Sequence, residues 1–278
     1  MIRRAVLFAC FALLAACNEP STPPVDGAVA LDATALDAGP LDAGPEPDAG
    51  PLDAGRDAST LDAGTDAGPV DAGPPVEGTI SGSCDEIDTE LLDPMAFRFE
   101  NEITFPVRLM ESDLEHFQEG TRQVLSDGTV GGSSVYSEAM SFEVLARCEG
   151  ATLLASEPFI RYMDESGTRT DLLVEIEGSR VGVSVTRAVH FPRADPYPLS
   201  EAQRLLMRKL EDIQESTANV DARDRWVKQI LHVMAYAPMH ADMFRMAWEM
   251  TPVEMRGDTI LLVTVTHGED EFIYDNEL

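Results

Sequence analysis

A repeated acidic segment divides this chain and limits how much of it can fold. Between residues 18 and 77 the tripeptide Asp-Ala-Gly occurs seven times, starting at positions 37, 42, 48, 53, 62, 66 and 71. The segment holds 13 acidic residues, one arginine and no aromatic residue. Such a composition buries too little apolar surface to offset the entropy of ordering, and its like charges repel one another. We therefore predict a disordered linker here, and a packed globular domain only in residues 78–278.

The first 17 residues have the parts of a bacterial export signal. Arg3 and Arg4 supply positive charge, and residues 5–16 form an apolar stretch of 12 residues, too short to span a bilayer. The end of this signal peptide (1–16) and the next residue, Leu14-Ala15-Ala16-Cys17, resemble the lipobox of bacterial lipoproteins. The resemblance implies cleavage before Cys17 and lipidation of its sulfur. The lipidated cysteine and the linker then make up residues 17–77.

The charge and the lipid together suggest a location and a set of partners. Position 18 is Asn rather than Asp, so an inner-membrane retention signal is missing. We expect a protein of the cell envelope, anchored in the outer membrane by its N-terminal lipid and facing the periplasm or the outer surface. Residues 78–278 hold 37 acidic and 17 basic residues, a net charge of −20. Long-range repulsion disfavours nucleic acid, so we expect an unknown protein or a small ligand as partner.

Two cysteines remain for the folded domain. Cys10 leaves with the signal peptide and Cys17 is consumed by lipid, which leaves Cys84 and Cys148. An even pair in an exported protein makes a disulfide plausible. Two cysteines can also lie too far apart to be bridged, so both outcomes stay open.

Hydrophobic periodicity predicts an α/β domain. Residues 78–130 give one clear pattern, an alternation from Phe97 to Leu109 that is typical of a strand. The later pattern predicts helix 134–147, strands 152–162, 171–176 and 181–186, a helix capped by Ser200, a helix over 223–250 kinked at Pro238, and strand 259–266. A mixed sheet is therefore expected, with the order helix, three strands, two helices and a strand.

This order resembles the core of the PD-(D/E)XK nuclease-like superfamily, over about residues 134–266. The resemblance implies a magnesium site in which an Asp opens the second strand and a Glu-x-Lys follows on the third. Asp171 matches the first position, in Arg169-Thr170-Asp171-Leu172. Ser184 stands where the metal-binding Glu is expected, and Thr186 stands where the Lys is expected.

These replacements change the expected chemistry. A hydroxyl cannot replace the charge of a carboxylate toward magnesium, and a threonine supplies no cation. The polar residues instead form a candidate binding site: Asp171, Ser184, Thr186 and Arg187. We therefore expect a pseudoenzyme, a lipoprotein presenting a non-catalytic domain for binding or structural support, without a cofactor. Any metal would be bound through Asp171.

An alternative keeps catalysis by moving the missing groups. In a magnesium-dependent nuclease or other hydrolase with a relocated site, a carboxylate would come from the first helix, and a cation from a neighbouring strand or helix. The candidates are Glu138 or Glu143 for the carboxylate and Arg187 or Lys209 for the cation.

Simpler structural interpretations stand beside these. Asp171 can merely cap its strand while pairing with Arg187 or Arg169. Gln229 and His232 would lie one turn apart on a helix as a satisfied interior pair. A methionine series suits either a flexible binding stripe or a core: Met234, Met239, Met243, Met246 and Met250. The sequence has no zinc or serine-hydrolase motif.

Overall fold

The computed structural model describes residues 75–130, 132–193 and 195–278. The export signal, Cys17 and nearly all of the Asp-Ala-Gly segment lie outside the described residues, so the predictions made for them stay predictions. No helix among the described residues is long and apolar enough to cross a membrane.

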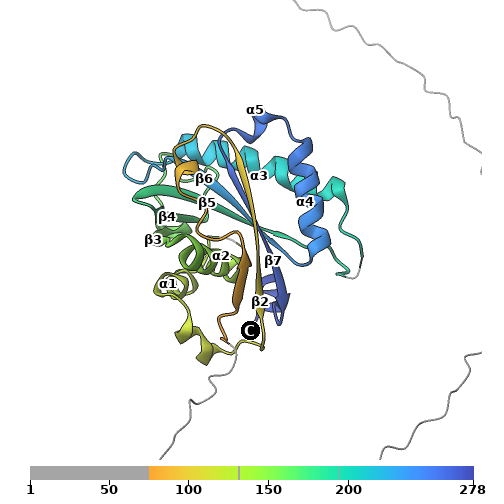
Figure 1. Ribbon diagram of the computed structural model, residues 1–278. Coiled ribbons are helices and arrows are strands. Elements are labelled where there is room, and N and C mark those ends of the chain that lie inside the picture. Colours follow the sequence, from red (N-terminus) through yellow and green to blue (C-terminus); the bar gives the residue numbers. More distant parts are fainter. Residues whose placement is uncertain (1–74, 131, 194) are drawn as a thin grey trace, which may run out of the picture. The chain divides into compact units, whose positions relative to one another are not determined.

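One mixed sheet runs through the described part of the chain, with the strand order β1-β2-β7-β6-β5-β4-β3 (Figure 1). Its strands are β1 (Thr79–Gly82), β2 (Phe97–Phe105), β3 (Thr152–Ser156), β4 (Leu172–Ile176), β5 (Ser179–Ala188), β6 (Lys228–Ala235) and β7 (Ile260–Gly268). The central strands β2, β7, β6 and β5 are parallel, whereas β1, β4 and β3 pair antiparallel with their neighbours. The α/β prediction is therefore confirmed as a mixed sheet.

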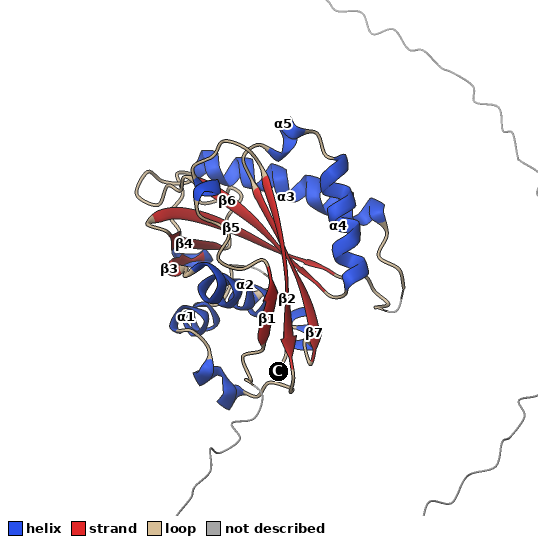
Figure 2. Ribbon diagram, viewed as in Figure 1, coloured by secondary structure: helices blue, strands red, loops and turns tan. Residues whose placement is uncertain are grey.

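Helices cover both faces of this sheet (Figure 2). The α-helices are α1 (Glu119–Asp127), α2 (Val135–Glu149), α3 (Leu199–Asn219), α4 (Pro238–Met250), α5 (Val253–Arg256) and α6 (Glu271–Asp275). Short 3-10 helices are η1 (Thr89–Leu91), η2 (Glu111–His116) and η3 (Glu157–Phe159). One apolar core joins α2 and α6 to the sheet, and a second joins α3 and α4 to its other face. Burial of these two cores supplies the main driving force for folding.

A tight hairpin fixes the register of β4 and β5. Glu177 and Gly178 have positive φ angles of 49° and 72°, the conformation that two-residue hairpin turns require. The register places Leu172 opposite Val183 and Val174 opposite Val181, so these side chains share the core face with α2. The two strands predicted over 171–176 and 181–186 are thus confirmed, as a hairpin of β4 and β5.

The predicted helix over 223–250 is wrong. Its first half is β6, and all eight residues of that strand are buried between β5 and β7. A central parallel strand is apolar on both faces, so its pattern lacks the alternation that marks a half-buried strand. Pro238 does not kink a helix but stands in the first turn of α4, where its missing N–H costs nothing. From α2 to β7, the observed order of α-helices and strands is thus helix, three strands, helix, strand, two helices and strand.

Smaller differences concern element ends. The strand expected over 152–162 stops at Ser156, and the strand expected to reach Leu109 stops at Phe105. The helix expected to be capped by Ser200 begins at Leu199, and Pro198 occupies the capping position without a side-chain bond. Helix α2 matches the predicted helix 134–147 and extends to Glu149. Strand β1 and helix α1 gave no clear periodicity in the sequence.

Candidate functional site around Asp171

Asp171 extends the β4–β5 ladder by one step. Its backbone N–H donates to the Val183 carbonyl at 3.1 Å, and its carboxylate Oδ2 accepts from the Val185 N–H at 2.6 Å. The carboxylate therefore takes the place of the next main-chain acceptor. The prediction that Asp171 caps its strand is right in kind, although neither predicted arginine is the partner.

Both of those arginines turn elsewhere. Arg187 donates to the carbonyls of Ile273 and Tyr274 at the end of α6, at 3.3 and 3.1 Å. Arg169 pairs with Glu165 in the preceding loop. Arg187 is therefore engaged with α6, and its guanidinium is not the cation that faces Asp171.

The two hydroxyl positions lie on β5 beside Asp171. Ser184 is 3% exposed, and the strand register places it next to the Leu172–Val183 pair, opposite Asp171. Its hydroxyl favours the ionised carboxylate and so opposes the rise in the pKa of Asp171. Thr186 follows two residues later on the same side of the strand and is half-buried. The structure thus brings Asp171, Ser184 and Thr186 to neighbouring positions.

A buried glutamate from α2 completes the acidic side of the site. Glu138 is 1% exposed and accepts a hydrogen bond from the Ser134 hydroxyl at 2.6 Å. Burial, followed by repulsion from Asp171, raises the pKa of Glu138 from 4.5 to about 7. Glu157 adds a weaker repulsion while accepting bonds from the Thr129 hydroxyl and the Val130 N–H. Of the two carboxylates proposed for relocation, Glu138 lies at the site.

The other proposed carboxylate lies elsewhere. Glu143 accepts from the Gln118 N–H at 3.0 Å and from the Thr121 hydroxyl at 2.5 Å, so it holds the start of α1 against α2. Lys209 on α3 is the cation whose charge acts on Asp171. Burial raises the pKa of Asp171, and Lys209 together with the Val185 N–H opposes that rise. The site therefore holds two carboxylates that resist ionisation and two cations: the charge of Lys209 acts on Asp171, and Arg187 interacts electrostatically with Glu138.

This donor set does not fit a magnesium site of the nuclease-like kind. Among the described residues, no group of three or more His, Cys, Asp or Glu side chains is arranged to hold a metal ion. The expected second carboxylate is a serine hydroxyl, and the carboxylate of Asp171 already accepts a main-chain bond. The groups present can accept hydrogen bonds and exchange a proton near neutral pH at Glu138.

Gln229 and His232 are not a helical pair, because both lie on β6. Gln229 donates to the Ser216 hydroxyl and the Ile213 carbonyl on α3, at 2.9 and 3.1 Å. The His232 ring bridges Ser141 on α2 and Thr264 on β7, at 2.8 and 2.7 Å. Full burial lowers the pKa of His232 to about 3, so it remains neutral at ordinary pH. Both side chains are satisfied in the interior, with partners that the sequence did not indicate.

Cys84 and Cys148 form a disulfide, with Cα atoms 4.6 Å apart. Beside it, the Glu149 carboxylate accepts the N–H groups of Asp85, Glu86 and Ile87 at 3.0–3.2 Å. The end of α2 is thus joined to the segment after β1 by a covalent bond and three hydrogen bonds. This arrangement is structural and lies apart from Asp171.

The methionine series divides between core and surface. Met234 is fully buried on β6, and Met243 packs partly against the core under α4. Three others on α4 are exposed by 41–62%: Met239, Met246 and Met250. The series is therefore neither one core stripe nor one continuous surface.

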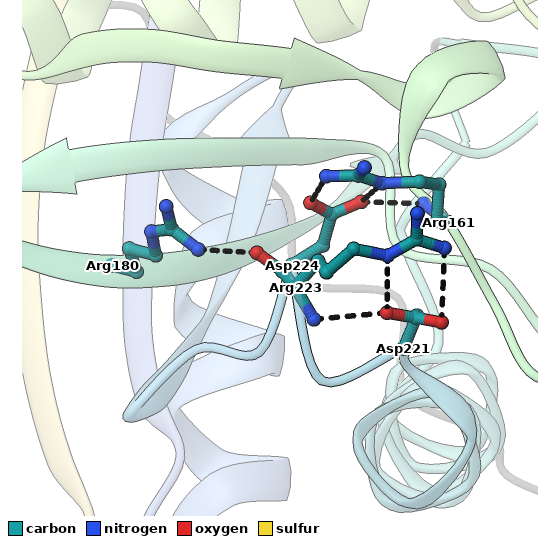
Figure 3. Close-up of polar contacts among 5 residues, drawn as sticks. All are labelled: Arg161, Arg180, Asp221, Arg223 and Asp224. Carbon is teal, nitrogen blue, oxygen red and sulfur yellow. Dashed lines mark hydrogen bonds and ion pairs between the residues drawn. The ribbon is translucent and has the colours of Figure 1, made fainter.

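A second polar cluster, the arginine network, lies near the start of β6 (Figure 3). Arg161 donates to both carboxylate oxygens of Asp224, and its backbone N–H adds a bond of 2.8 Å to the same group. Arg223 pairs with Asp221, and Arg180 donates to the Arg223 carbonyl. Hydrogen bonds from Arg223 lower the pKa of Asp221 to about 2, and those from Arg161 lower the pKa of Asp224.

Comparison with known proteins adds little to this geometry. No family model matches the chain. It is 36% identical over 162 residues to the AAC-rich mRNA clone AAC4 protein of Dictyostelium discoideum, which covers 56% of this chain and 23% of that protein. Among solved structures, that of Pyrococcus furiosus SfsA in complex with Ca2+ is similar at 16% identity. The match covers 52% of this chain and 58% of SfsA, with a TM-score of 0.25. The chain spans less than a quarter of the Dictyostelium protein, and we assign no family from these matches.

Proposed function

We propose that this protein is a membrane-anchored lipoprotein that presents a non-catalytic, nuclease-like domain for ligand binding or structural support. The fold supports the nuclease-like part of the proposal. The elements α2, β3, β4, β5, α3 and β6 follow one another as helix, three strands, helix and strand. That is the order expected of a PD-(D/E)XK core, with β6 in place of the strand that the sequence suggested.

The hydrogen bond from the Val185 N–H to Asp171 carries the non-catalytic part of the proposal. It commits the one matching carboxylate to the β4–β5 ladder. The two positions that would complete a nuclease site are the hydroxyls of Ser184 and Thr186. Magnesium requires negatively charged or strongly polar oxygen ligands with nearly octahedral geometry, which this set does not supply.

The catalytic test is metal-dependent nicking of supercoiled plasmid DNA by the full chain. We expect no nicking with Mg2+ or Mn2+, and no change in Asp171→Asn. The matched gain-of-function variant is Ser184→Glu with Thr186→Lys, which restores both missing groups on β5. Nicking by this variant alone would support the fold assignment and a silent natural domain. Nicking by the natural chain that disappears in Asp171→Asn would overturn the proposal.

A relocated catalytic site is the second candidate, and the proximity of Glu138 to Asp171 favours it. A buried carboxylate whose pKa is raised by burial and by a second carboxylate, as that of Glu138 is by Asp171, with Lys209 near Asp171, is an arrangement that enzymes also use. This candidate predicts nicking, or hydrolysis of another ester, that is lost in both Glu138→Gln and Asp171→Asn. Glu143→Gln is the matched control, because Glu143 is buried on the same helix but faces α1.

The anchor is tested independently of the domain. We expect Cys17→Ser to release the protein from membranes or to block its processing, because the thiol is the lipid attachment point that the lipobox implies. Cys10→Ser is the control, since that cysteine lies within the signal segment and should leave anchoring unchanged. Equal partitioning of Cys17→Ser and the natural chain into detergent would contradict the lipoprotein assignment.

A further inference from the structure

A small open cavity lies at the carboxyl end of β5, apart from Asp171. Its volume is about 220 Å³, and its walls are Val189, Tyr197, Glu201, Arg204, Leu205 and Arg208. Val189 directly follows β5, Tyr197 belongs to the loop before α3, and the other four residues line one side of α3. In open α/β sheets, ligands bind beyond the carboxyl ends of parallel strands, which is where this cavity lies.

Two arginines without an ion pair lie side by side in the cavity wall. Most basic side chains among the described residues make an ion pair or a hydrogen bond, as Arg161, Arg187 and Lys228 do. Arg204 and Arg208 are exposed and make neither with any described residue. Acids outnumber bases by more than two to one in residues 78–278. Two unpaired guanidinium groups one helical turn apart are therefore a local departure from the charge of the domain.

The acid in the cavity wall is already occupied. Glu201 accepts a hydrogen bond from His190 Nδ1 at 2.9 Å, so its carboxylate faces that ring as well as the cavity. It does not pair with Arg204 or Arg208 within ion-pair distance. The positive charge of the two arginines thus stays available to a ligand.

Tyr197 contributes a side chain with a hydroxyl group to the same cavity wall. Its side chain is 5% exposed, and its ring lies edge-on to His240 and stacked on Phe244, with centroids 5.0 and 6.2 Å away. The hydroxyl makes no hydrogen bond with a described residue and does not belong to the buried side-chain atoms that lack a partner, in keeping with its place in the wall of an open cavity. Burial, and then the charge of Glu201, raise the pKa of Tyr197 to about 12. The hydroxyl is therefore protonated at neutral pH and able to donate.

We propose that this cavity binds the phosphate group of a small molecule, with Arg204 and Arg208 contacting its oxygens and Tyr197 donating a hydrogen bond. Arginine forks suit phosphate oxygens, and a phosphate monoester carries about −1.5 to −2 charges at neutral pH, which matches two guanidinium groups. The volume holds a phosphate and a few further atoms, being smaller than the roughly 300–1,000 Å³ of larger ligand sites. Val189 and Leu205 provide apolar contact for the ester carbon. This site goes beyond the proposed function and uses none of its residues.

The phosphate can belong to a soluble ester or to a lipid headgroup, and two probes separate these sources. The first is isothermal titration with inorganic phosphate and with glycerol 3-phosphate. The second is co-sedimentation with phosphatidylcholine vesicles that contain phosphatidic acid. Both use the full chain carrying Cys17→Ser, so that lipidation does not hold the protein on vesicles. Saturable binding in either experiment supports the site and identifies its source.

The decisive variants remove two arginine charges, either inside the cavity or elsewhere on the surface. We expect Arg204→Gln with Arg208→Gln to weaken binding at least tenfold, and Tyr197→Phe to weaken it threefold to tenfold with little change in melting temperature. The control is Arg122→Gln with Arg225→Gln, two exposed arginines on α1 and before β6, and its affinity should stay within twofold. Absence of saturable binding to both probes, or equal losses in the two double variants, would overturn the site. So would binding to duplex DNA alone. A loss of phosphate binding in Asp171→Asn would instead place the ligand at the other site.

Discussion

Two aspartates near β4, β5 and β6 have pKa values shifted in opposite directions. Asp224 is 6% exposed, yet the bonds it accepts from Arg161 lower its pKa. Asp171 is half-buried, and its surroundings raise its pKa. The difference lies in the partners. Asp224 faces a guanidinium that binds both of its oxygens (Figure 3), whereas Asp171 has one main-chain N–H, a serine hydroxyl and a more distant lysine.

This contrast separates aspartates held in structural ion pairs from carboxylates that form no ion pair. In the arginine network each aspartate is paired with an arginine. The network therefore stabilises the loop before β6, and its charged groups are not free to bind a ligand. Around Asp171, Glu138 lies buried with a pKa of about 7; it accepts a bond from Ser134 and feels the charge of Arg187, but it forms no ion pair with a described arginine. Perturbed carboxylates of this kind occur more often at functional positions than in structural pairs.

The largest effect is expected from Asp224→Asn, which should destabilise the domain by about 2 kcal/mol at pH 7, because hydrogen bonds to a charged group are among the strongest. Urea denaturation measures it. The matched control is Glu211→Gln, an exposed acid on α3, which should change the unfolding free energy by less than about 0.5 kcal/mol. Equal changes in the unfolding free energy for Asp224→Asn and Glu211→Gln would show that Asp224 is not part of a stabilising ion pair.

The pH dependence of Asp224→Asn sharpens the same prediction. The folded-state pKa of Asp224 lies below its ordinary value of 3.8. Its contribution is therefore fully present above about pH 4 and is lost as the pH falls through the folded-state pKa. The stability difference between the natural chain and Asp224→Asn should accordingly fade as the pH falls below about 4.

A smaller effect of opposite sign is expected from Glu138→Gln. The pKa of Glu138 is raised from 4.5 to about 7, so the folded state prefers the protonated acid and loses stability as the pH rises between these values. The shift corresponds to about 3 kcal/mol at pH 8. The buried amide N–H groups that replace the acid offset part of this gain, so we expect a net stabilisation on the order of 1 kcal/mol at pH 8 and none at pH 4. Chemical denaturation at both pH values tests this. A stabilisation that does not grow with pH would contradict the raised pKa.

Local signals in the sequence were enough to predict several elements. Gly178 and its polar neighbours mark the β4–β5 hairpin, and the face shared by Val135, Ala139 and Phe142 marks α2. They failed for β6, where Lys228, Gln229 and His232 interrupt an apolar run and imitate a polar helix face. Those three side chains are satisfied by groups from other elements: carbonyls in and after η1 for the lysine, α3 for the glutamine, and α2 with β7 for the histidine. Contacts between elements that are separated in the sequence do not produce a periodic pattern of apolar residues, so the sequence does not reveal them.

In the candidate site, too, the local contacts can be predicted from the sequence and the contacts between distant residues cannot. Asp171, Ser184 and Thr186 are near one another because the hairpin joins their strands, and spacing along the chain suffices to predict that. Glu138 and Lys209 reach the site only through the packing of α2 and α3 on the sheet. The sequence named both as candidates but could not separate Glu138 from Glu143. Five residues change the position by about 140° around a helix axis, and only the packing shows which one faces Asp171.

The smallest effect is expected from Asp171→Asn, within about 0.5 kcal/mol of the natural chain at pH 7. The amide oxygen can still accept from the Val185 N–H, and loss of the charge relieves the repulsion with Glu138. Asp171→Ala should cost about 1 kcal/mol more, since it leaves the Val185 N–H without its acceptor.

The readout specific to this site is the titration of Glu138 by carboxyl NMR: its pKa should fall from about 7 toward 4.5 in Asp171→Asn and stay unchanged in Asp224→Asn. An unchanged Glu138 titration in Asp171→Asn would show that the two carboxylates do not interact. A destabilisation as large as that of Asp224→Asn would mean that the charge of Asp171 is a structural ion-pair charge after all.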